Sequence, residues 1–188
     1  MNDDQRPPAQ RILVLLGTDV HPFARLRDWA DRRAAAHPEE EILVQHGSTP
    51  APSVARGVEM LPPDELHRTL LRMDIAVTHG GPGTIASARA AGLTPIILPR
   101  DPSHGEHVDD HQMRFARWAS ERRLGEVVLS VDHLDRQIDA SDRAQPRVEN
   151  PQEQVAATTR RIVEQLQLLR TRGASRRRVP SLGRSVWG

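Results

Sequence analysis

The amino-acid sequence predicts an α/β protein whose parallel β-sheet is covered by helices on both faces. Short apolar segments alternate with longer helix-like segments, as strands and helices do in βαβ units. The segment "RILVLL" at 11–16 is apolar after its first residue, which indicates a strand buried on both faces. A glycine-rich turn, "HGGPGT" at 79–84, joins another such strand to a helix. These observations predict a Rossmann-like sheet with right-handed crossovers.

The remaining elements follow from the same alternation. Apolar segments bounded by turn residues predict further strands at 41–46, 57–61, 74–79, 95–99 and 126–130. Helices are expected at 22–36, 64–72, from the glycine turn to about Gly92, and 107–123. Pro22 suits a first helical turn, and Gly125 suits a helix C-terminus. Because parallel sheets bind ligands beyond the carboxyl ends of their strands, the loops at that edge are the candidate site.

The chain is expected to contain one folded domain with extensions at both ends. We predict a flexible N-terminus at 1–10 and the Rossmann-like domain at 11–140. A linker and an amphipathic helix follow at 141–172, since apolar residues at 155, 162, 166 and 169 form a stripe. Residues 173–188 are expected to be a disordered basic tail.

Composition excludes several classes of protein. The 188 residues include no cysteine, which excludes disulfides and thiolate metal sites. The formal net charge of +1 argues against nucleic acid as a partner. No apolar run approaches the roughly 20 residues of a membrane helix, and the N-terminus has no signal-peptide pattern, so a cytoplasmic protein is expected. The arginines from Arg170 to Arg184 suit either a solvated tail or contact with anionic lipid.

The glycine turn has the features of an anion-binding site. A strand runs into glycine and then into a helix N-terminus, where free amides and the helix dipole favour negative charge. Gly81 and Gly83 lack a Cβ, so phosphate oxygens can approach the backbone. Thr84 adds a hydroxyl, and His79 can donate a hydrogen bond to phosphate. We therefore predict a phosphate site here.

Three classes of ligand or activity are compatible with this turn. Gly81, Gly83 and Ala86 fit the dinucleotide fingerprint, with Asp101 twenty residues after Gly81, although that fingerprint normally opens a domain. The string "HGGPG" also occurs in esterase oxyanion holes, but the chain has no G-x-S-x-G nucleophile elbow. The third class is the nucleotide sugar. A nucleotide- or NAD(P)-binding module with a regulatory or oxidoreductase role is the alternative function.

The nucleotide-sugar class rests on a family resemblance. The stretch "THGGPGTIASARAAGLTPIILP" followed by "DDHQ" resembles the C-terminal, nucleotide-sugar-binding domain of family-28-type glycosyltransferases. The segments "LVLLGTDVHPFARL", "EILVQHGST" and "DELHRTLLRMDIAVTHGGPGT" follow the expected order, so the resemblance spans about 11–130. It implies a fold equivalent to the C-terminal half of a two-domain (GT-B) glycosyltransferase.

Within this family the chain is most similar to split, soluble donor-binding subunits. One such subunit belongs to the enzyme that adds the second N-acetylglucosamine to a lipid-pyrophosphate carrier, and bacterial relatives act in exopolysaccharide assembly. The resemblance implies a UDP-sugar donor and a lipid-linked acceptor. It also implies a membrane-anchored acceptor-binding subunit as partner, and a location peripheral to the inner face of the cell membrane.

The resemblance also assigns roles to individual residues. His79, Gly83 and Thr84 would hold the donor diphosphate, with Thr18 adding a hydroxyl from the opposite side. The pair His111 and Gln112 would contact the donor sugar.

One position departs from the family pattern. Ser87 stands where a ribose-binding glutamate is usual, so Glu106 becomes a candidate for holding the ribose.

Two further roles concern histidines. His107 and His111 are four residues apart, a spacing that can chelate a metal, and His104 lies close in sequence. The family type is metal-independent, so the resemblance implies neither a metal nor any other cofactor. His21 in "GTDVHPF" is the candidate catalytic base that faces the acceptor.

Overall fold

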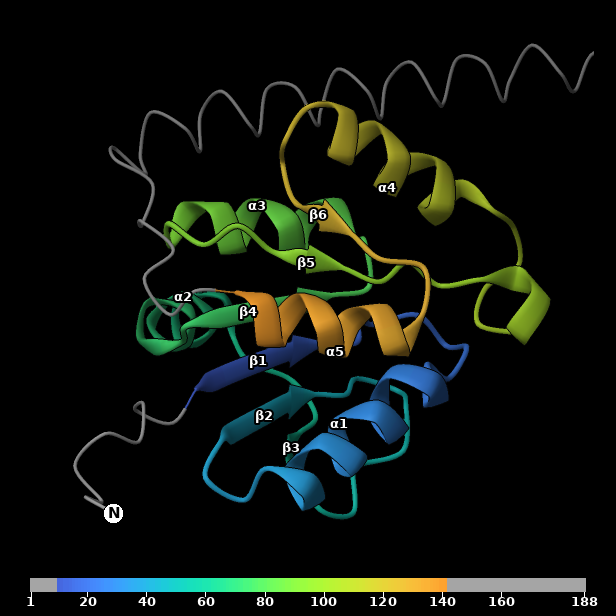
Figure 1. Ribbon diagram of the computed structural model, residues 1–188. Helices are drawn as coiled ribbons and strands as arrows, with labels where there is room; N and C mark the ends of the chain where they lie inside the picture. The colour runs from blue at the N-terminus through green and yellow to red at the C-terminus, as the bar shows by residue number, and fades with distance from the viewer. Residues whose placement is uncertain (1–9, 142–188) are drawn as a thin grey trace, which may run out of the picture.

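The computed structural model describes residues 10–141, which form a six-stranded parallel sheet in the order β3-β2-β1-β4-β5-β6 (Figure 1). The strands are β1 (Arg11–Leu15), β2 (Glu41–Gln45), β3 (Arg56–Val58), β4 (Ile75–Thr78), β5 (Ile96–Ile97) and β6 (Glu126–Val127). The helices are α1 (Ala24–Ala36), α2 (Pro63–Arg72), α3 (Pro82–Ala90), the 3-10 turn η2 (Pro102–His104), α4 (His111–Glu121) and α5 (Val131–Ala140). The predicted Rossmann-like α/β fold is confirmed.

The central strand β1 shows why its sequence is continuously apolar. It pairs in parallel with β2 on one side and β4 on the other. Its side chains alternate between two buried clusters: Ile12 and Val14 face α1 and α5, whereas Leu13 and Leu15 face α2 and α3. Both faces are therefore shielded from water from Ile12 onward, and apolar side chains are required at those positions of the strand.

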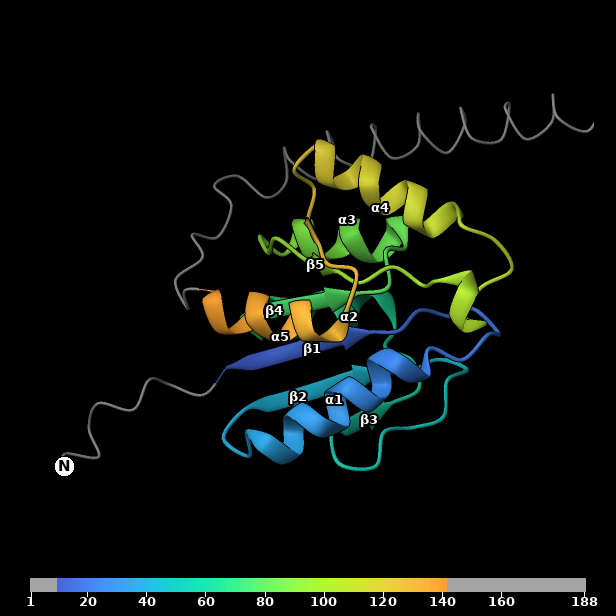
Figure 2. The same ribbon diagram turned by 45° about the vertical axis from the view of Figure 1, so that its right-hand side comes forward.

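The helices lie in two layers, with α1 and α5 on one face and α2 and α3 on the other (Figures 1 and 2). Helix α4 covers the β5 end of the sheet, where Phe115 and Ala119 pack with Ile97 and with Ile85 of α3. The carboxyl ends of the strands lead into loops, and the loop after β5 contains the short turn η2 (Figure 2).

Helix α5 was not predicted from the sequence. Its Leu134 and Ile138 are fully buried against the α1 side of the sheet. Its Asp135 faces α1 and accepts hydrogen bonds from Trp29 Nε1 at 2.9 Å and from Arg33 at 3.2 Å. Helix α5 therefore completes the helical layer that α1 begins on this face of the sheet.

Two sequence predictions at the α4 end are wrong. The helix expected at 107–123 begins only at His111, and residues 107–110 belong to the loop after β5. Gly125 does not adopt the left-handed cap conformation. Arg123 does, with φ of 55°, while a Cβ on Gly125 would lie 2.7 Å from the Pro95 carbonyl oxygen. Glycine is therefore required at position 125, because the backbone there packs directly against Pro95 and Ile97.

Helix and strand ends shift elsewhere by a few residues. Helix α1 begins at Ala24 with Phe23 as its N-cap, so Pro22 precedes the helix. The last predicted strand, 126–130, is reduced to β6, and the third begins one residue earlier than predicted. Within residues 10–141, no helix is both long and apolar enough to cross a membrane. The N-terminus before residue 10, the helix expected at 152–170 and the basic tail lie outside the described residues.

The burial of α5 predicts a stability effect. Replacing Leu134 with alanine removes a fully buried side chain and should lower the free energy of unfolding by about 2–5 kcal/mol. The matched control is Leu129→Ala, whose side chain is 67% exposed and whose loss should change stability by less than about 0.5 kcal/mol. Urea denaturation followed by circular dichroism measures both. Equal stability of the two variants would show that α5 is not integral to the domain.

Candidate functional site

The predicted site residues come from three loops that meet at the carboxyl edge of the sheet. Thr18 and His21 follow β1, His79 and Gly81 follow β4, and Glu106 follows β5. The loops touch one another: Gly17 lies against the His79 ring, and Asp19 pairs with His107. Segments far apart in the sequence thus form one continuous polar surface.

The glycine turn provides an open helix N-terminus. Gly81 is the N-cap of α3, and no side chain caps this end of the helix. Proline at the next position has no N–H, so the amides of Gly83 and Thr84 are the ones that can face a ligand. A Cβ on Gly83 would meet no atom of another segment within 4 Å, which means that the space beside Gly83 is open. This geometry suits an anion.

His79 is enclosed by two glycines. A Cβ on Gly17 would lie 2.7 Å from the imidazole ring, and a Cβ on Gly81 would collide with Nε2. Gly17 also has a positive φ of 86°, which disfavours any side chain there. Glycine is therefore needed at both positions to admit the ring between the β1 and β4 loops.

The protonation state of His79 bears on its predicted contact with phosphate, which stays a prediction. Its Nδ1 lies 3.2 Å from the Leu15 carbonyl oxygen, which can only accept, so Nδ1 carries the proton. Burial lowers the pKa of His79 to about 4, and the ring is neutral at pH 7. Nε2 then holds a lone pair, and His79 cannot donate to phosphate unless it gains a second proton.

The two hydroxyl groups assigned to the diphosphate lie at the same edge. Thr84 donates its hydroxyl to the Gly81 carbonyl at 2.8 Å, and its oxygen can still accept a hydrogen bond. Thr18 is exposed in the β1 loop, beside the point where the β2 loop packs on Gly17. Ser87 lies one helical turn beyond Gly83 on α3 and is partly buried. The roles of these residues stay predictions.

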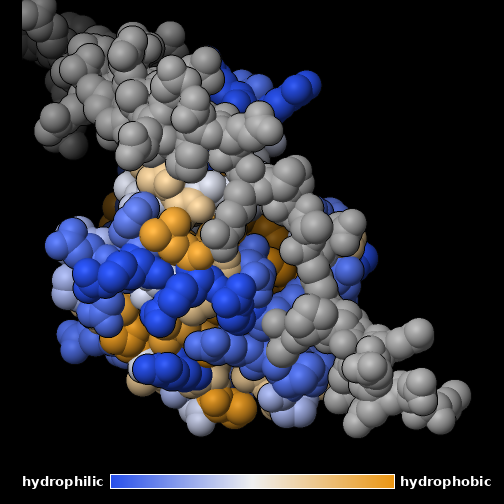
Figure 3. All heavy atoms as spheres, turned by 90° about the vertical axis from the view of Figure 1, so that its left-hand side faces the viewer, coloured by the Kyte–Doolittle hydropathy of each residue, from blue (hydrophilic) through white to orange (hydrophobic). Residues whose placement is uncertain are grey.

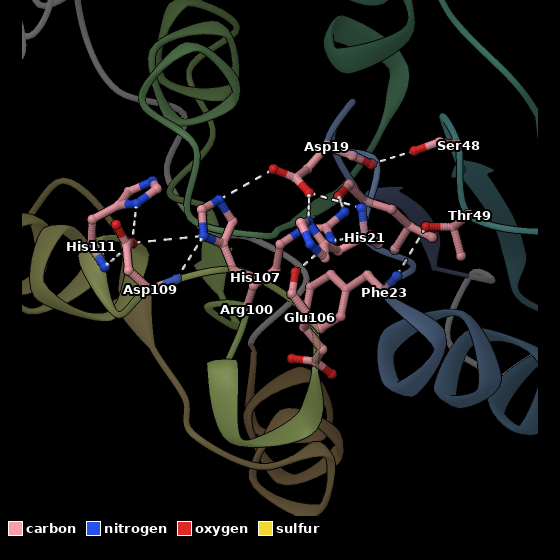
Figure 4. A network of polar contacts seen from close by, with 11 residues as sticks. Asp19, His21, Phe23, Ser48, Thr49, Arg100, Glu106, His107, Asp109 and His111 are labelled. Carbon is pink, nitrogen blue, oxygen red and sulfur yellow. Dashed lines mark hydrogen bonds and ion pairs between the residues drawn. The ribbon is translucent and has the colours of Figure 1, made fainter.

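A fully buried arginine joins the β1 and β5 loops, and it was not predicted. The Arg100 guanidinium donates to the Leu16 carbonyl at 2.8 Å, to the Glu106 carbonyl at 3.0 Å, and to the His21 carbonyl (Figure 4). Its carbon Cζ lies 5.0 Å from the centre of the Phe23 ring. A charged residue directly after the buried segment "PIILP" was the signal in the sequence. A guanidinium at that point can bind the carbonyl oxygens at the strand ends.

Glu106 is engaged in an ion pair. Its side chain is buried, and its two carboxylate oxygens accept hydrogen bonds from Arg25 at 3.0 and 2.8 Å. The backbone N–H of Asp101 donates to the same carboxylate at 2.9 Å. A ribose contact from Glu106 would require this pair to open. In this structure Glu106 connects the β5 loop to Arg25 of α1, and its contact with a ribose stays a prediction.

His21 is oriented by Asp19. One Asp19 oxygen accepts from His21 Nδ1 at 2.6 Å and from the His21 backbone N–H at 2.8 Å (Figure 4). Burial alone would raise the pKa of Asp19, but these hydrogen bonds and the charges of His107 and Arg100 outweigh it and lower the pKa. With its Nδ1 proton held by a carboxylate, the His21 ring has a lone pair on Nε2, as a general base requires.

His111 and Gln112 form the first turn of α4. Gln112 is 8% exposed, and its Oε1 has no hydrogen-bond partner among the described residues. An unpaired buried acceptor is costly unless a ligand donates to it. His111 instead points toward the loop, where its Nδ1 lies 2.5 Å from an Asp109 oxygen. The predicted sugar contact is compatible with Gln112 and stays untested.

The opposite edge of the sheet has a different character. Seen from that side, the surface is mostly hydrophilic with scattered apolar residues (Figure 3). A cavity of about 390 Å³ lies there between α2 and the first residues of β1 and β2, lined in part by Arg11, Glu41 and Arg72. None of the predicted site residues lines it. The carboxyl edge therefore remains the candidate site.

A doubly wound parallel sheet with an open helix N-terminus after β4 defines a Rossmann-like domain with a candidate anion site. A model of the glycosyltransferase family 28 C-terminal domain matches residues 12–166, and the chain belongs to this family. The fold corresponds to the C-terminal half of GT-B glycosyltransferases. The family resemblance seen in the sequence is confirmed.

Similar proteins include several glycosyltransferases. The elloramycin glycosyltransferase ElmGT of Streptomyces olivaceus is 33% identical over 104 residues, which are 50% of this chain and 26% of that protein. The structure of CalG4, the calicheamicin glycosyltransferase, matches 88% of this chain and 43% of its own, with a TM-score of 0.57 at 20% identity. The structure of SsfS6 of Streptomyces sp. SF2575, complexed with thymidine diphosphate, matches 86% of this chain and 42% of its own. Its TM-score is 0.55 at 20% identity. The chain thus spans less than half of each relative.

The enclosure of His79 predicts a pH dependence of stability. Because the folded-state pKa of about 4 lies below the unfolded value of about 6.5, the unfolded chain binds the proton more readily as pH falls. Between pH 6.5 and pH 4, the wild type should lose about 3 kcal/mol more unfolding free energy than His79→Gln.

The control is His67→Gln, an exposed position on α2 that should keep the wild-type pH profile. Chemical denaturation at a series of pH values measures the three profiles. Parallel profiles for the wild type and His79→Gln would contradict the assigned protonation state.

Proposed function

We propose that this domain binds a nucleoside diphosphate sugar at the carboxyl edge and acts in transfer of the sugar to an acceptor hydroxyl. The observation that carries the proposal is the open, uncapped N-terminus of α3 at Gly83 and Thr84, in a chain of the family 28 C-terminal domain. The donor we propose is a UDP-sugar, and the relative SsfS6, solved with thymidine diphosphate, supports a nucleoside diphosphate as ligand.

The chemistry of the leaving group follows from the same turn. When the bond between the anomeric carbon and the diphosphate breaks, negative charge grows on the phosphate oxygens. Amides of Gly83 and Thr84 and the dipole of α3 stabilise that charge without moving, because the helix is already in place. Thr18 contributes a hydroxyl from the β1 loop, and Gln112 takes a sugar hydroxyl as hydrogen-bond donor to its unpaired Oε1.

His21 is the proposed base. As the acceptor oxygen attacks the anomeric carbon, its proton passes to His21 Nε2, and the electron pair of the broken bond leaves with the diphosphate. Asp19 supports this role because it holds the Nδ1 proton and stabilises the imidazolium that forms. The His21 side chain is 35% exposed, so an acceptor can reach it.

An NAD(P)-binding module is the alternative from the sequence. Gly81, Gly83 and Ala86 keep the fingerprint spacing, but they follow β4 rather than the first strand. The Asp101 carboxylate accepts from the Ser103 backbone N–H at 2.8 Å within the β5 loop. A thermal-shift comparison of UDP, UDP-sugars, dTDP and NAD(P) separates the two functions. Stabilisation by NAD(P) alone would overturn the proposed donor.

Donor binding predicts the effect of a side chain at Gly83. Replacement by valine fills the space in front of the α3 amides and should weaken UDP binding at least tenfold, since phosphate oxygens can no longer approach. The fold should persist, because a Cβ at this position meets no atom within 4 Å.

The matched control is Ala90→Val, at the other end of the same helix, which should bind UDP as the wild type does. Titration calorimetry gives the affinities, and thermal unfolding confirms that both variants fold. Unchanged affinity of Gly83→Val would place the phosphate site elsewhere.

We further propose that a separate, membrane-anchored subunit supplies the acceptor half and presents a lipid-linked acceptor at the inner face of the membrane. The resemblance to split donor-binding subunits supports this proposal. Val20 and Val108 flank the polar site and are 79% and 75% exposed, as expected of residues that a partner covers. The basic tail is a candidate for contact with anionic lipid.

The proposed acceptor-binding subunit leads to two expected outcomes. The purified chain alone should transfer no sugar, and co-expression with the acceptor subunit should restore transfer from a UDP-sugar. Val20→Asp with Val108→Asp should abolish co-purification, whereas Val54→Asp, 59% exposed in the β2–β3 loop, should not. Efficient transfer to a lipid acceptor by the isolated chain would rule out the split arrangement.

A further inference from the structure

We propose that His107, Asp109 and His111 form a binding site for one divalent transition-metal ion, with Asp19 as its outer support. Each of the three residues offers a donor atom, and these atoms all lie within 4.8 Å of one another. They are on the loop after β5 and the first turn of α4, at the edge of the candidate site (Figure 4). The proposal departs from the expectation, drawn from the sequence, that no metal binds.

The distances between the donor atoms suit a single ion. Asp109 Oδ1 lies 2.5 Å from His111 Nδ1 and 3.7 Å from His107 Nδ1. In a tetrahedral site with metal–ligand bonds of about 2.0–2.1 Å, ligand atoms are about 3.3 Å apart. Shifts of less than about 1 Å would therefore bring the donor atoms from their present positions to the spacing of a tetrahedral metal site. The rings of His107 and His111 stand perpendicular with centres 4.4 Å apart. His111 Nδ1 donates to Asp109 Oδ1, so ion binding moves the Nδ1 proton to Nε2 and replaces this hydrogen bond with a bond from each atom to the ion.

The hydrogen bonds of His107 show which of its nitrogens carries the lone pair, and an ion would take the place of the backbone contact that this lone pair now accepts. The Asp109 backbone N–H donates to His107 Nδ1 at 3.3 Å, so Nδ1 is unprotonated. The proton is therefore on Nε2, which lies 3.2 Å from Asp19 Oδ2. A carboxylate that holds the far nitrogen of a histidine is the usual outer support of a metal-ligating imidazole. Asp19 provides that support from the β1 loop.

The donor set selects the class of metal. Two imidazoles and one carboxylate favour Zn²⁺, Co²⁺ or Ni²⁺, whereas Mg²⁺ and Ca²⁺ prefer oxygen ligands only. Three protein ligands leave a further position for water or a substrate oxygen. The side chains of Asp109 and His111 are 55% and 46% exposed, so an ion can enter from solvent. Asp110 is not part of the site, because its carboxylate pairs with Arg114.

The experiment measures metal binding by the full chain, without a polyhistidine tag and without nucleotide, so its result is independent of the proposed function. After chelator treatment, the protein is titrated with Co²⁺ and followed by the visible d–d absorbance, with Zn²⁺ added in competition. One equivalent of Co²⁺ is expected to bind and to be displaced by Zn²⁺. Affinity should fall at least tenfold in His111→Ala and His107→Ala, and 10–100-fold in Asp19→Asn.

The matched controls are His104→Ala, an exposed histidine of the same loop, and Asp110→Asn, both of which should bind as the wild type does. Thermal unfolding without metal shows that each variant is folded, and His111→Ala removes only a half-exposed side chain. The proposal is overturned if the wild type shows no saturable Co²⁺ binding, if Mg²⁺ displaces Co²⁺ as readily as Zn²⁺ does, or if folded His111→Ala binds with unchanged affinity.

Discussion

One buried guanidinium determines the shape of the functional edge. Arg100 is inaccessible to solvent, and burial lowers the pKa of its side chain, which shows how much solvation the charge has lost. The loss is offset by carbonyl oxygens of Leu16, His21 and Glu106, which lie on two different loops. Moving either loop away would leave a buried charge without partners, which is strongly unfavourable. The loops that carry His21 and His107 are therefore held in one arrangement, before any ligand binds.

Most of the fold follows from apolar patterning. The segments that became β1, β2 and β4 are apolar in their middle residues because helices cover both of their faces, and this pattern is visible in the sequence. Helix α5 escaped prediction because half of its residues are charged or amide side chains, and only Leu134 and Ile138 enter the core. The late start of α4 escaped because His107 is held by contacts to Asp19, a residue remote in sequence.

The site was predictable where it depends on local backbone geometry. The turn at Gly81 and Gly83 forms an open helix N-terminus. This was predictable because glycine and proline determine the backbone conformation of the few residues around them. Pairings between loops were not predictable, since nothing in the sequence links Asp19 to His107 or Arg25 to Glu106. The protonation of His79 was likewise hidden, because it depends on burial beneath two loops and on one carbonyl oxygen of β1.

The enclosure of His79 has an evolutionary consequence. Gly17, His79 and Gly81 share one small volume, and the imidazole occupies the space that two Cβ atoms would otherwise take. A mutation at either glycine is blocked as long as the histidine is present, and the histidine can be lost without a clash. The residue types at the three positions should therefore change together in evolution. Relatives that have a smaller residue at 79 should accept residues other than glycine at 81. At 17 the positive φ keeps glycine favoured even then.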